Sequence, residues 1–516
     1  MRPPDQKEIQ AKRLFITRTL AVLVFVLVAM TAILLRLYWL QIQHHDHYKT
    51  LATDNRIKLL PLPPARGEIY DRNGVVLAKN ITSVDLFITP DQVDDIPAVI
   101  AELQEIVTIT EEDIQRFGKL RRRLRRFEQV PIRTGLTDEE MAQFAVERHR
   151  FRGVDLGVNL RRYYPFGELT AHVVGYIGRI NERELERIDK AAYAGTSHIG
   201  KTGLERFYEE QLHGDVGVQR VEIDAMGHII RILETQPPVT GEDIQLHFDI
   251  ELQKIAFEAL GEHAGSVVVI DVKTGGVLAM ASKPSFDANL FVNGISFKDY
   301  NALRDDSGNP LFNRAINGSY PPGSTVKPFI GLAGLETQTV NHVQSIYCPG
   351  HYRIKNAGRT FRDWKRTGHG TIDLEKSIEQ SCDVYYYDLA YSMGIDKMHD
   401  YLAQFHFGKQ TGIDMPAETS AVLPSQKWKK RRYKQSWLPG DTVNAGIGQG
   451  YFLVSPVQLA YATAVLAADG KLIHPRLASR IGKQSALSPG AEMESIHKKD
   501  PQNWEHVIDG MLAVTE

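Results

Sequence analysis

The chain has 516 residues, of which 43% are hydrophobic and 24% are charged, an ordinary composition for a globular protein of more than one domain. Its formal net charge of −2 gives no overall attraction to nucleic acid, and we expect no nucleic-acid partner. Two cysteines are too few to form a disulfide framework.

The first predicted element is a membrane helix near the N-terminus. Seventeen residues, Thr19 to Leu35, carry no charge. As a helix they would span roughly 26 Å, at the short end of a bilayer core. Arg36 can extend its charge to the membrane surface, and Leu37-Tyr-Trp-Leu40 is typical of an interfacial aromatic belt. These features predict a transmembrane anchor over residues 19–40.

Basic residues precede this apolar stretch: Arg2, Lys7, Lys12, Arg13 and Arg18. By the positive-inside rule, residues 1–18 form a cytoplasmic tail and the rest of the chain lies outside. The alternative is a cleaved signal peptide, which would have a shorter apolar core followed by small residues at the cleavage site. The Arg-Leu-Tyr-Trp-Leu run does not match that pattern, so we favour an uncleaved anchor. No other stretch is long enough to span, which predicts a single-pass protein.

Residues 41–240 predict an elongated α+β pedestal. We expect a helical stalk over 41–60 and a strand–turn–strand unit around the Asn-Gly turn at Asn73-Gly74. Residues 93–150 are expected to be mainly helical. Val216–Ile223 is expected to be a strand.

Residues 245–516 predict a second, α/β domain. Asp249–Leu260 has the apolar spacing of a helix, and Gly265–Asp271 with Val277–Ala281 predicts a buried hairpin. Mainly helical sequence is expected from there to about residue 405.

This second domain contains the motif Ser324-Thr-Val-Lys327, preceded by Tyr320-Pro-Pro-Gly323. If Ser324 opens a helix, Lys327 lies on the same helix face. A serine hydroxyl is a poor nucleophile until a neighbouring base takes its proton, and a partly desolvated lysine can be that base. The spacing alone also fits an N-cap serine followed by an exposed lysine, and Ser495-Ile-His-Lys498 is such a chance occurrence.

A second polar motif, Ser381-Cys382-Asp383, follows. Ser-x-x-Lys followed by Ser-x-[Asn/Asp] is the ordered signature of the penicillin-recognising acyl-serine enzymes. Further segments carry a narrower resemblance: Pro64-Ala-Arg-Gly-Glu-Ile-Tyr-Asp71, Arg161-Arg-Tyr-Tyr-Pro165, Gly200-Lys-Thr-Gly-Leu-Glu205, Asn313-Arg-Ala315, Asp363-Trp364 with Gly368-His-Gly370, and Gly448-Gln-Gly-Tyr451. With these motifs the chain, from about residue 12 to its end, resembles penicillin-binding protein 2, the class B transpeptidase family of bacterial cell elongation.

The resemblance implies a fold, a location and partners. It implies a transpeptidase domain with an antiparallel sheet sandwiched by helices, anchored in the bacterial inner membrane with the catalytic domain in the periplasm. The pedestal would space this domain from the membrane and dock a SEDS-type rod-shape glycan polymerase and elongation scaffold proteins.

The resemblance also implies residue roles. Ser324 would be the nucleophile and Lys327 its general base, while Ser381 and Asp383 would form the second motif, with Asp383 where Asn is commoner in the superfamily. The reaction implied is crosslinking of peptidoglycan stem peptides through an acyl-serine at D-Ala-D-Ala. β-Lactams would trap Ser324.

A third motif, Lys-[Thr/Ser]-Gly, is expected after Asp383 on a strand beside the cleft. Lys201-Thr-Gly203 and Lys273-Thr-Gly275 both precede Ser324, and no such motif occurs between Asp383 and Glu516. Either this sequence ends before the third motif or the protein is defective. The last residues have the character of a helix interior and lack a helix cap, which favours a truncated transpeptidase domain. A domain without the third motif would lack full activity.

Both cysteines, Cys348 and Cys382, lie near the active-site motifs, with Asp363 and His369 between them. Three alternatives are open: a disulfide, two buried free thiols, or a structural Zn²⁺ bound by Cys348, Asp363, His369 and Cys382. We favour zinc, which some penicillin-binding protein 2 members carry here.

Two other functions remain alternatives. One is a D,D-carboxypeptidase or β-lactamase that uses the same nucleophile, although the large pedestal and uncleaved anchor argue against it. The other is a non-catalytic β-lactam sensor or scaffold that activates a glycan polymerase, which the absent third motif favours.

Overall fold

The computed structural model describes residues 6–45, 49, 56–122, 126–224, 229–292, 294–354, 359–486 and 494–516. The chain divides into two compact units. One holds the residues up to Leu62 together with Val216–Pro238, and the other holds Pro63–Asp215 together with Val239–Glu516.

The first unit contains the N-terminal helix and a three-stranded sheet. Its elements are α1 (Gln6–Tyr38), η1 (Trp39–Gln43), β1 (Ile57–Leu62), β8 (Gly217–Ile223) and β9 (Ile229–Gln236), with the strand order β1-β8-β9. Within the described residues, Arg13–Gln43 is the one helical segment long and apolar enough to cross a membrane. This segment agrees with the predicted membrane anchor.

The strand predicted at 216–223 is confirmed, but the helical stalk predicted over 41–60 is wrong in its last part. Ile57 to Leu62 form β1, which pairs antiparallel with β8 from Ile57↔Glu222 to Leu62↔Gly217. The local sequence does not reveal this pairing, because β8 lies about 160 residues further along the chain than β1. The middle of the predicted stalk (46–48 and 50–55) lies outside the described residues.

The second unit begins with a seven-stranded sheet. Its strands run in the order β18-β17-β10-β2-β3-β4, and β5 also pairs with β3. They are β2 (Ile69–Tyr70), β3 (Val76–Ile88), β4 (Val130–Arg133), β5 (Val154–Tyr163), β10 (Ile244–Leu246), β17 (Ala478–Ile481) and β18 (Gln484–Ser485). Strands from the far end of the chain therefore extend the pedestal sheet.

The turn between β2 and β3 confirms the predicted strand–turn–strand unit. The buried carboxylate of Asp71 accepts hydrogen bonds from the backbone N–H groups of Asn73 and Val75, both at 2.8 Å. Gly74 takes the left-handed conformation (φ 84°) that favours glycine in such a turn.

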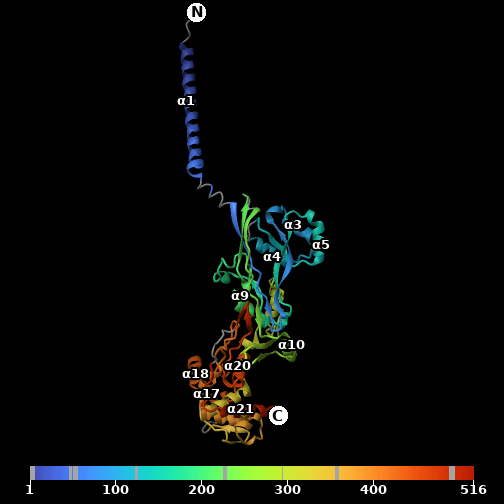
Figure 1. Cartoon of the computed structure of the whole chain (residues 1–516), viewed down its shortest axis with the longest axis vertical. Coiled ribbons are helices and arrows are strands. Elements are labelled where there is room, and N and C mark those ends of the chain that lie inside the picture. Colours follow the sequence, from blue (N-terminus) through green and yellow to red (C-terminus); the bar gives the residue numbers. More distant parts are fainter. Residues whose placement is uncertain are drawn as a thin grey trace. The chain divides into compact units, whose positions relative to one another are not determined.

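Three helices pack beside the far end of β3 (Figure 1). They are α3 (Ile96–Leu103), α4 (Glu111–Arg121) and α5 (Asp138–Glu147). Leu86 and Ile88 of β3 share a core with Phe117 and Phe144 from these helices. The prediction of mainly helical sequence over 93–150 is confirmed, with β4 interrupting it.

The rest of the pedestal consists of short elements: η2 (Pro90–Gln92), η3 (Arg148–Arg150), η4 (Gly167–Leu169), α6 (Ala171–Val174), β6 (Ile177–Arg179), α7 (Glu182–Leu185), β7 (His198–Gly200), α8 (Gly203–Phe207) and α9 (Glu209–His213).

Three separated sequence motifs meet at the buried carboxylate of Glu205 in α8. Arg66 donates to its Oε2 at 2.6 Å, Arg162 to its Oε1 at 2.7 Å, and the Tyr164 hydroxyl also contacts Oε1 at 3.2 Å. Arg66 also pairs with Glu209 at 2.7 Å. Burial raises the pKa of Glu205, but the two guanidinium groups outweigh it and hold the pKa below its usual range.

The catalytic-domain hairpin forms as predicted, from β11 (Gly265–Ile270) and β12 (Val277–Lys283). Its faces alternate with the period of a strand. Val267 and Val269 pack with α10 (Ile250–Ala259), while Val268 and Ile270 pack with the opposite core. The hairpin is thus covered on both faces. Helix α10 is also as predicted, and begins because the Asp249 carboxylate caps its first turn.

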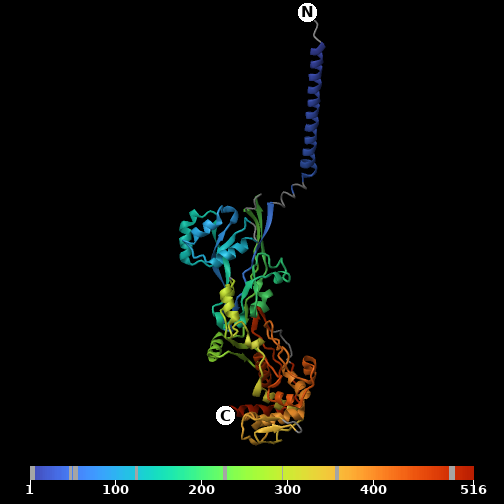
Figure 2. The same ribbon diagram turned by 180° about the vertical axis from the view of Figure 1, so that it is seen from behind.

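Helices make up most of the chain after the hairpin, and the orange and red ones lie together in both views (Figures 1 and 2). The helices are α11 (Asn289–Val292), α12 (Phe297–Asp305), α13 (Arg314–Asn317), η5 (Gly323–Val326), α14 (Lys327–Glu336), α15 (Leu374–Glu379), α16 (Asp383–Met393), α17 (Ile395–Leu402), η6 (Ala403–Phe405), α18 (Gln426–Tyr433), α19 (Pro439–Ala445), α20 (Pro456–Ala467) and α21 (Gln502–Ala513).

Four short strands interrupt the helical sequence expected before residue 405. They are β13 (Ile346–Cys348), β14 (His351–Arg353), β15 (Thr360–Arg362) and β16 (Gly370–Ile372), paired antiparallel as β13-β16 and β14-β15. These strands are too short to leave a periodic signal in the sequence. The predicted domain boundaries, 41–240 and 245–516, stay predictions.

The Glu205 network makes the first testable prediction. Glu205→Gln leaves two arginines without their shared counter-charge, so we expect the free energy of unfolding at pH 7 to fall by about 3 to 5 kcal/mol. Because the folded pKa of Glu205 is lowered, the wild-type contribution is complete above the unfolded pKa of about 4.3 and is lost as the pH falls through the folded value.

The difference between wild type and variant in thermal or urea unfolding should therefore be largest at neutral pH and shrink below about pH 4. Glu251→Gln, which removes an exposed pair with Lys254, is the matched control and should change stability little. A Glu205→Gln protein as stable as this control at pH 7 would contradict the prediction.

Candidate active site

Ser324 lies in a short 3-10 turn that leads directly into a helix. The turn is η5, and α14 begins at Lys327. Ser324 is exposed, whereas Lys327 is only 1% exposed. The predicted helix start is confirmed, with exposed Ser324 on the first turn and buried Lys327 one turn later. The structure therefore does not match the chance alternative, in which the lysine is exposed.

The Lys327 ammonium contacts the second polar motif. Its Nζ donates to the Ser381 carbonyl oxygen at 2.7 Å, to Ser381 Oγ at 3.1 Å and to Asp383 Oδ1 at 2.7 Å. An ammonium group has three donors, so all three are used. The Tyr386 ring lies 5.4 Å from Nζ. The structure thus brings together three of the four predicted catalytic residues around one atom, with Ser324 at the adjoining turn.

Ser381 adopts a backbone conformation that is uncommon outside glycine. Its φ is 50°, in the left-handed region, between α15 and α16. This turn directs both the carbonyl and the hydroxyl of Ser381 towards Lys327. Asp383 is the first residue of α16. Its second carboxylate oxygen, Oδ2, accepts from the Trp364 backbone N–H at 3.1 Å, which orients the carboxylate.

Trp364 is a positioning residue whose role the sequence did not reveal. Its indole Nε1 donates to the carbonyl oxygens of Ser381 (3.1 Å) and Gln380 (3.2 Å), while 63% of the residue stays exposed. An exposed tryptophan tied to the Ser381 backbone stabilises the segment that faces Lys327. Its place beside Asp363 in a family motif was the only available signal.

Gly448 contacts the backbone just before the predicted nucleophile. Its carbonyl accepts from the Gly323 N–H at 2.9 Å, and Gly448 has a φ of 66°. A Cβ atom at Gly448 would lie 2.3 Å from the Gly323 oxygen. Only glycine therefore allows this close approach, which explains the Gly448-Gln-Gly-Tyr451 motif.

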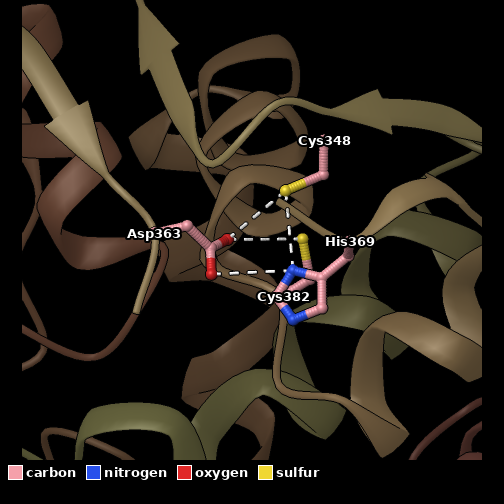
Figure 3. A group of neighbouring side chains, drawn as sticks. All are labelled: Cys348, Asp363, His369 and Cys382. Atoms are coloured by element: carbon pink, nitrogen blue, oxygen red, sulfur yellow. Dashed lines mark hydrogen bonds and ion pairs between the residues drawn. The ribbon is translucent and has the colours of Figure 1, made fainter. Parts of the chain in front are cut away.

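The four predicted metal ligands lie together in a buried cluster (Figure 3). Antiparallel pairing of Cys348 with Gly370 places His369 beside Cys348. Asp363 directly follows β15, and Cys382 is the N-cap residue of α16. The structure keeps both cysteines as free thiols, so it does not form the disulfide alternative. This group could hold a metal ion.

The distances between these donor atoms suit a four-coordinate ion. Asp363 Oδ2 lies 3.6 Å from Cys348 Sγ and 3.5 Å from Cys382 Sγ, and His369 Nδ1 lies 3.5 Å from Cys348 Sγ and 3.6 Å from Asp363 Oδ1. Ligands about 2.0–2.3 Å from a tetrahedral centre are separated by about this much. Burial raises the pKa of the Cys382 thiol, so a cation is needed to stabilise its thiolate.

The two early Lys-Thr-Gly sequences serve structural purposes. Lys201 pairs with Glu184, and Thr202 is the N-cap residue of α8. Lys273-Thr-Gly275 forms the turn between β11 and β12, where the Asp271 carboxylate accepts from the Lys273 N–H at 2.9 Å. Neither therefore supplies the third motif.

Comparison with known proteins identifies the family. Residues 61–246 match the penicillin-binding protein dimerisation domain, and residues 265–515 match the penicillin-binding protein transpeptidase domain. The peptidoglycan D,D-transpeptidase MrdA of Acinetobacter baumannii is 44% identical over 509 residues, which cover 98% of this chain and 76% of that protein. The chain belongs to the penicillin-binding protein 2 family. The predicted resemblance is confirmed, including its pedestal and transpeptidase domains.

Two solved structures are also similar. The complex between penicillin-binding protein 2 and MreC from Helicobacter pylori superposes with a TM-score of 0.77 at 30% identity, covering 89% of this chain and 84% of that one. A peptidoglycan synthase complex that coordinates polymerisation and crosslinking superposes with a TM-score of 0.70 at 27% identity, covering 96% and 84%. The expectation that the chain given is truncated before its third motif stays a prediction.

Proposed function

We propose that this penicillin-binding protein 2 member crosslinks peptidoglycan stem peptides through an acyl-enzyme at Ser324. The observation that supports the proposal most strongly is the buried Lys327 Nζ, which joins the Ser-x-x-Lys turn to Ser381 and Asp383. Lys327 would act as the base for Ser324, which is exposed on the preceding helical turn, where backbone N–H groups favour a developing oxyanion.

In the first half-reaction, Ser324 Oγ attacks the carbonyl carbon between the two terminal D-alanines of a donor stem. A C–O bond forms, and the hydroxyl proton passes to the neutral amine form of Lys327, which has first released one ammonium proton to solvent. As the C–N bond breaks, Ser381 passes a proton from the lysine to the departing amine, and D-alanine leaves. Asp383 holds the ammonium form of Lys327 in place between these transfers.

In the second half-reaction, an amine of a neighbouring stem attacks the ester carbonyl. A new C–N bond forms, the C–O bond breaks, and Ser324 recovers its proton from the attacking amine through Lys327. The result is a crosslink, with no net change in the enzyme. β-Lactams resemble D-Ala-D-Ala and would stop the cycle at the acyl-serine.

The location and partners proposed follow the same family. We propose a single-pass inner-membrane anchor with a cytoplasmic N-terminus and a periplasmic catalytic domain. The related complexes with MreC and within a peptidoglycan synthase support docking of elongation scaffold proteins and a SEDS-type glycan polymerase on the pedestal.

Covalent labelling tests the nucleophile. Fluorescent penicillin should label the wild-type chain and should not label Ser324→Ala, because among the described residues no other serine lies three residues before a buried lysine. Ser495→Ala removes the exposed serine of the chance motif Ser495-Ile-His-Lys498 and should label normally. Labelling that survives in Ser324→Ala would refute the assignment. Release of the bound label within minutes would favour the carboxypeptidase or β-lactamase alternative, and rod shape maintained by Ser324→Ala in cells would favour the scaffold.

The contact between Gly448 and Gly323 gives another prediction. Gly448→Ala must displace Gly323, so we expect the rate of penicillin labelling to fall roughly 10- to 100-fold. Gly394→Ala is the matched control, because Gly394 also has a positive φ but no atom lies within 4 Å of its added Cβ. Gly448→Ala should lose more stability in thermal unfolding than Gly394→Ala, because its clash with Gly323 adds to the strain that a positive φ gives both variants. Equal labelling rates in the two variants would contradict the role given to Gly448.

We further propose that Cys348, Asp363, His369 and Cys382 bind a structural Zn²⁺. When bound, zinc would fix the β13–β16 loops to the start of α16 and perform no chemistry. Asp363 supports this role, since its Oδ2 also accepts from the Val384 backbone N–H at 3.0 Å, one residue after Asp383.

Metal analysis of protein purified without chelator should give about one zinc per chain, and Cys348→Ser should reduce it strongly. Penicillin labelling of Cys348→Ser should slow as well, because the Ser381–Asp383 segment loses its support. Substoichiometric zinc together with a Cys348–Cys382 crosslink by mass spectrometry would refute zinc and restore the disulfide.

A further inference from the structure

A cationic helix lies on the surface of the transpeptidase domain. Between Glu418 and Asp441 the chain has no carboxylate side chain but carries six basic residues in and around α18: Lys427, Lys429, Lys430, Arg431, Arg432 and Lys434. All except Lys429 are exposed. Within the described part of the chain, no ion pair joins these five exposed residues to a carboxylate.

This concentration of charge is unfavourable for the isolated helix. Like charges three and four residues apart, such as Lys427 with Lys430 and Arg431, destabilise a helix by about 0.2–0.5 kcal/mol per pair. The negative end of the helix dipole offsets only the charges in the last turn. An anionic ligand would remove the remaining repulsion.

Aromatic rings lie among these charges. The Tyr451 ring is 5.5 Å from Trp428, 5.4 Å from Tyr433 and 6.3 Å from Trp437. Lys429, the buried member, lies over the Tyr451 ring at 5.2 Å and pairs with Asp441, which fixes α18 to this aromatic cluster. Tyr433 remains 46% exposed. An exposed ring with half-buried neighbours beside cations is suited to a ligand that has both apolar faces and carboxylates.

The same segment adjoins the active site. Tyr451 follows Gly448, whose carbonyl holds the Gly323 N–H beside Ser324. Three residues beyond Tyr451, Val454 pairs with Tyr320 through two hydrogen bonds of 2.9 Å. The α18 surface, defined as the five exposed basic residues with Trp428, Tyr433, Trp437 and Tyr451, therefore flanks the turn that carries the proposed nucleophile.

We infer that the α18 surface binds the carboxylate-bearing glycopeptide strand whose stem peptides react at Ser324. The inference rests on the proposed function and names a second contact of that substrate, outside the reacting bond. The free carboxylates of the stem peptides match the exposed lysines and arginines in charge. The apolar faces of the sugars match the exposed Tyr433 ring and the half-buried Trp428 and Trp437 rings. The surface would hold a long strand close to the cleft and would not affect a ligand as small as penicillin.

The test compares full-length chains that carry Lys430→Gln with Arg431→Gln against the wild type. Binding to soluble, uncrosslinked peptidoglycan strands is measured by sedimentation at several salt concentrations. We expect the double variant to bind about 10-fold more weakly, with a shallower salt dependence, because two exposed charge contacts are lost. The charge-preserving pair Lys430→Arg with Arg431→Lys should bind like the wild type.

Arg183→Gln with Arg187→Gln removes the same charge from exposed residues around α7 and is the matched control, which should bind normally. Penicillin labelling of Ser324 should be equal in all these chains, so failure of this inference is separable from failure of the proposed function. Unchanged strand binding by the α18 variant would overturn the inference. Loss of binding to vesicles of anionic phospholipid with strand binding intact would assign the surface to lipid and overturn it as well.

Discussion

A lysine ammonium buried in the transpeptidase domain constrains the geometry of the active site. Lys327 is removed from water, so each of its three N–H donors needs an acceptor, and all three are found on Ser381 and Asp383. That requirement sets the left-handed turn at Ser381 and the start of α16. The same hydrogen bonds that offset the burial of Lys327 fix its side chain against Ser381 and Asp383.

The segment that supplies hydrogen-bond acceptors to Lys327 is itself held in place by neighbouring residues. Trp364 contacts Ser381 and Asp383, and its neighbour Asp363 lies in the Cys348–His369–Cys382 cluster. One short stretch of chain therefore connects a buried group that could hold a metal ion to the two residues that contact Lys327, through hydrogen bonds made by Trp364. Such an arrangement stabilises a strained turn without placing a further functional group in the cleft.

A buried ionic group also constrains the structure of the pedestal. Motifs from three parts of the chain converge on Glu205, where two arginines and a tyrosine surround one carboxylate. A buried ionic group is destabilising when any partner is missing, so it favours the one arrangement in which all partners meet. This network gives the residues of these motifs a structural role.

The sequence by itself determined the family, the apolar N-terminal helix, the α10 helix, the β11–β12 hairpin and the residues of both polar motifs. Apolar periodicity, turn residues and spaced polar side chains are local properties that a sequence displays directly. Only the tertiary structure decided that residues 57–62 pair with β8, that β17 joins the pedestal sheet, that Trp364 contacts Ser381 and Asp383, and that Gly448 contacts Gly323. Each of these depends on contacts between segments far apart in the chain, whose partners are selected by packing and hydrogen bonding in the folded protein.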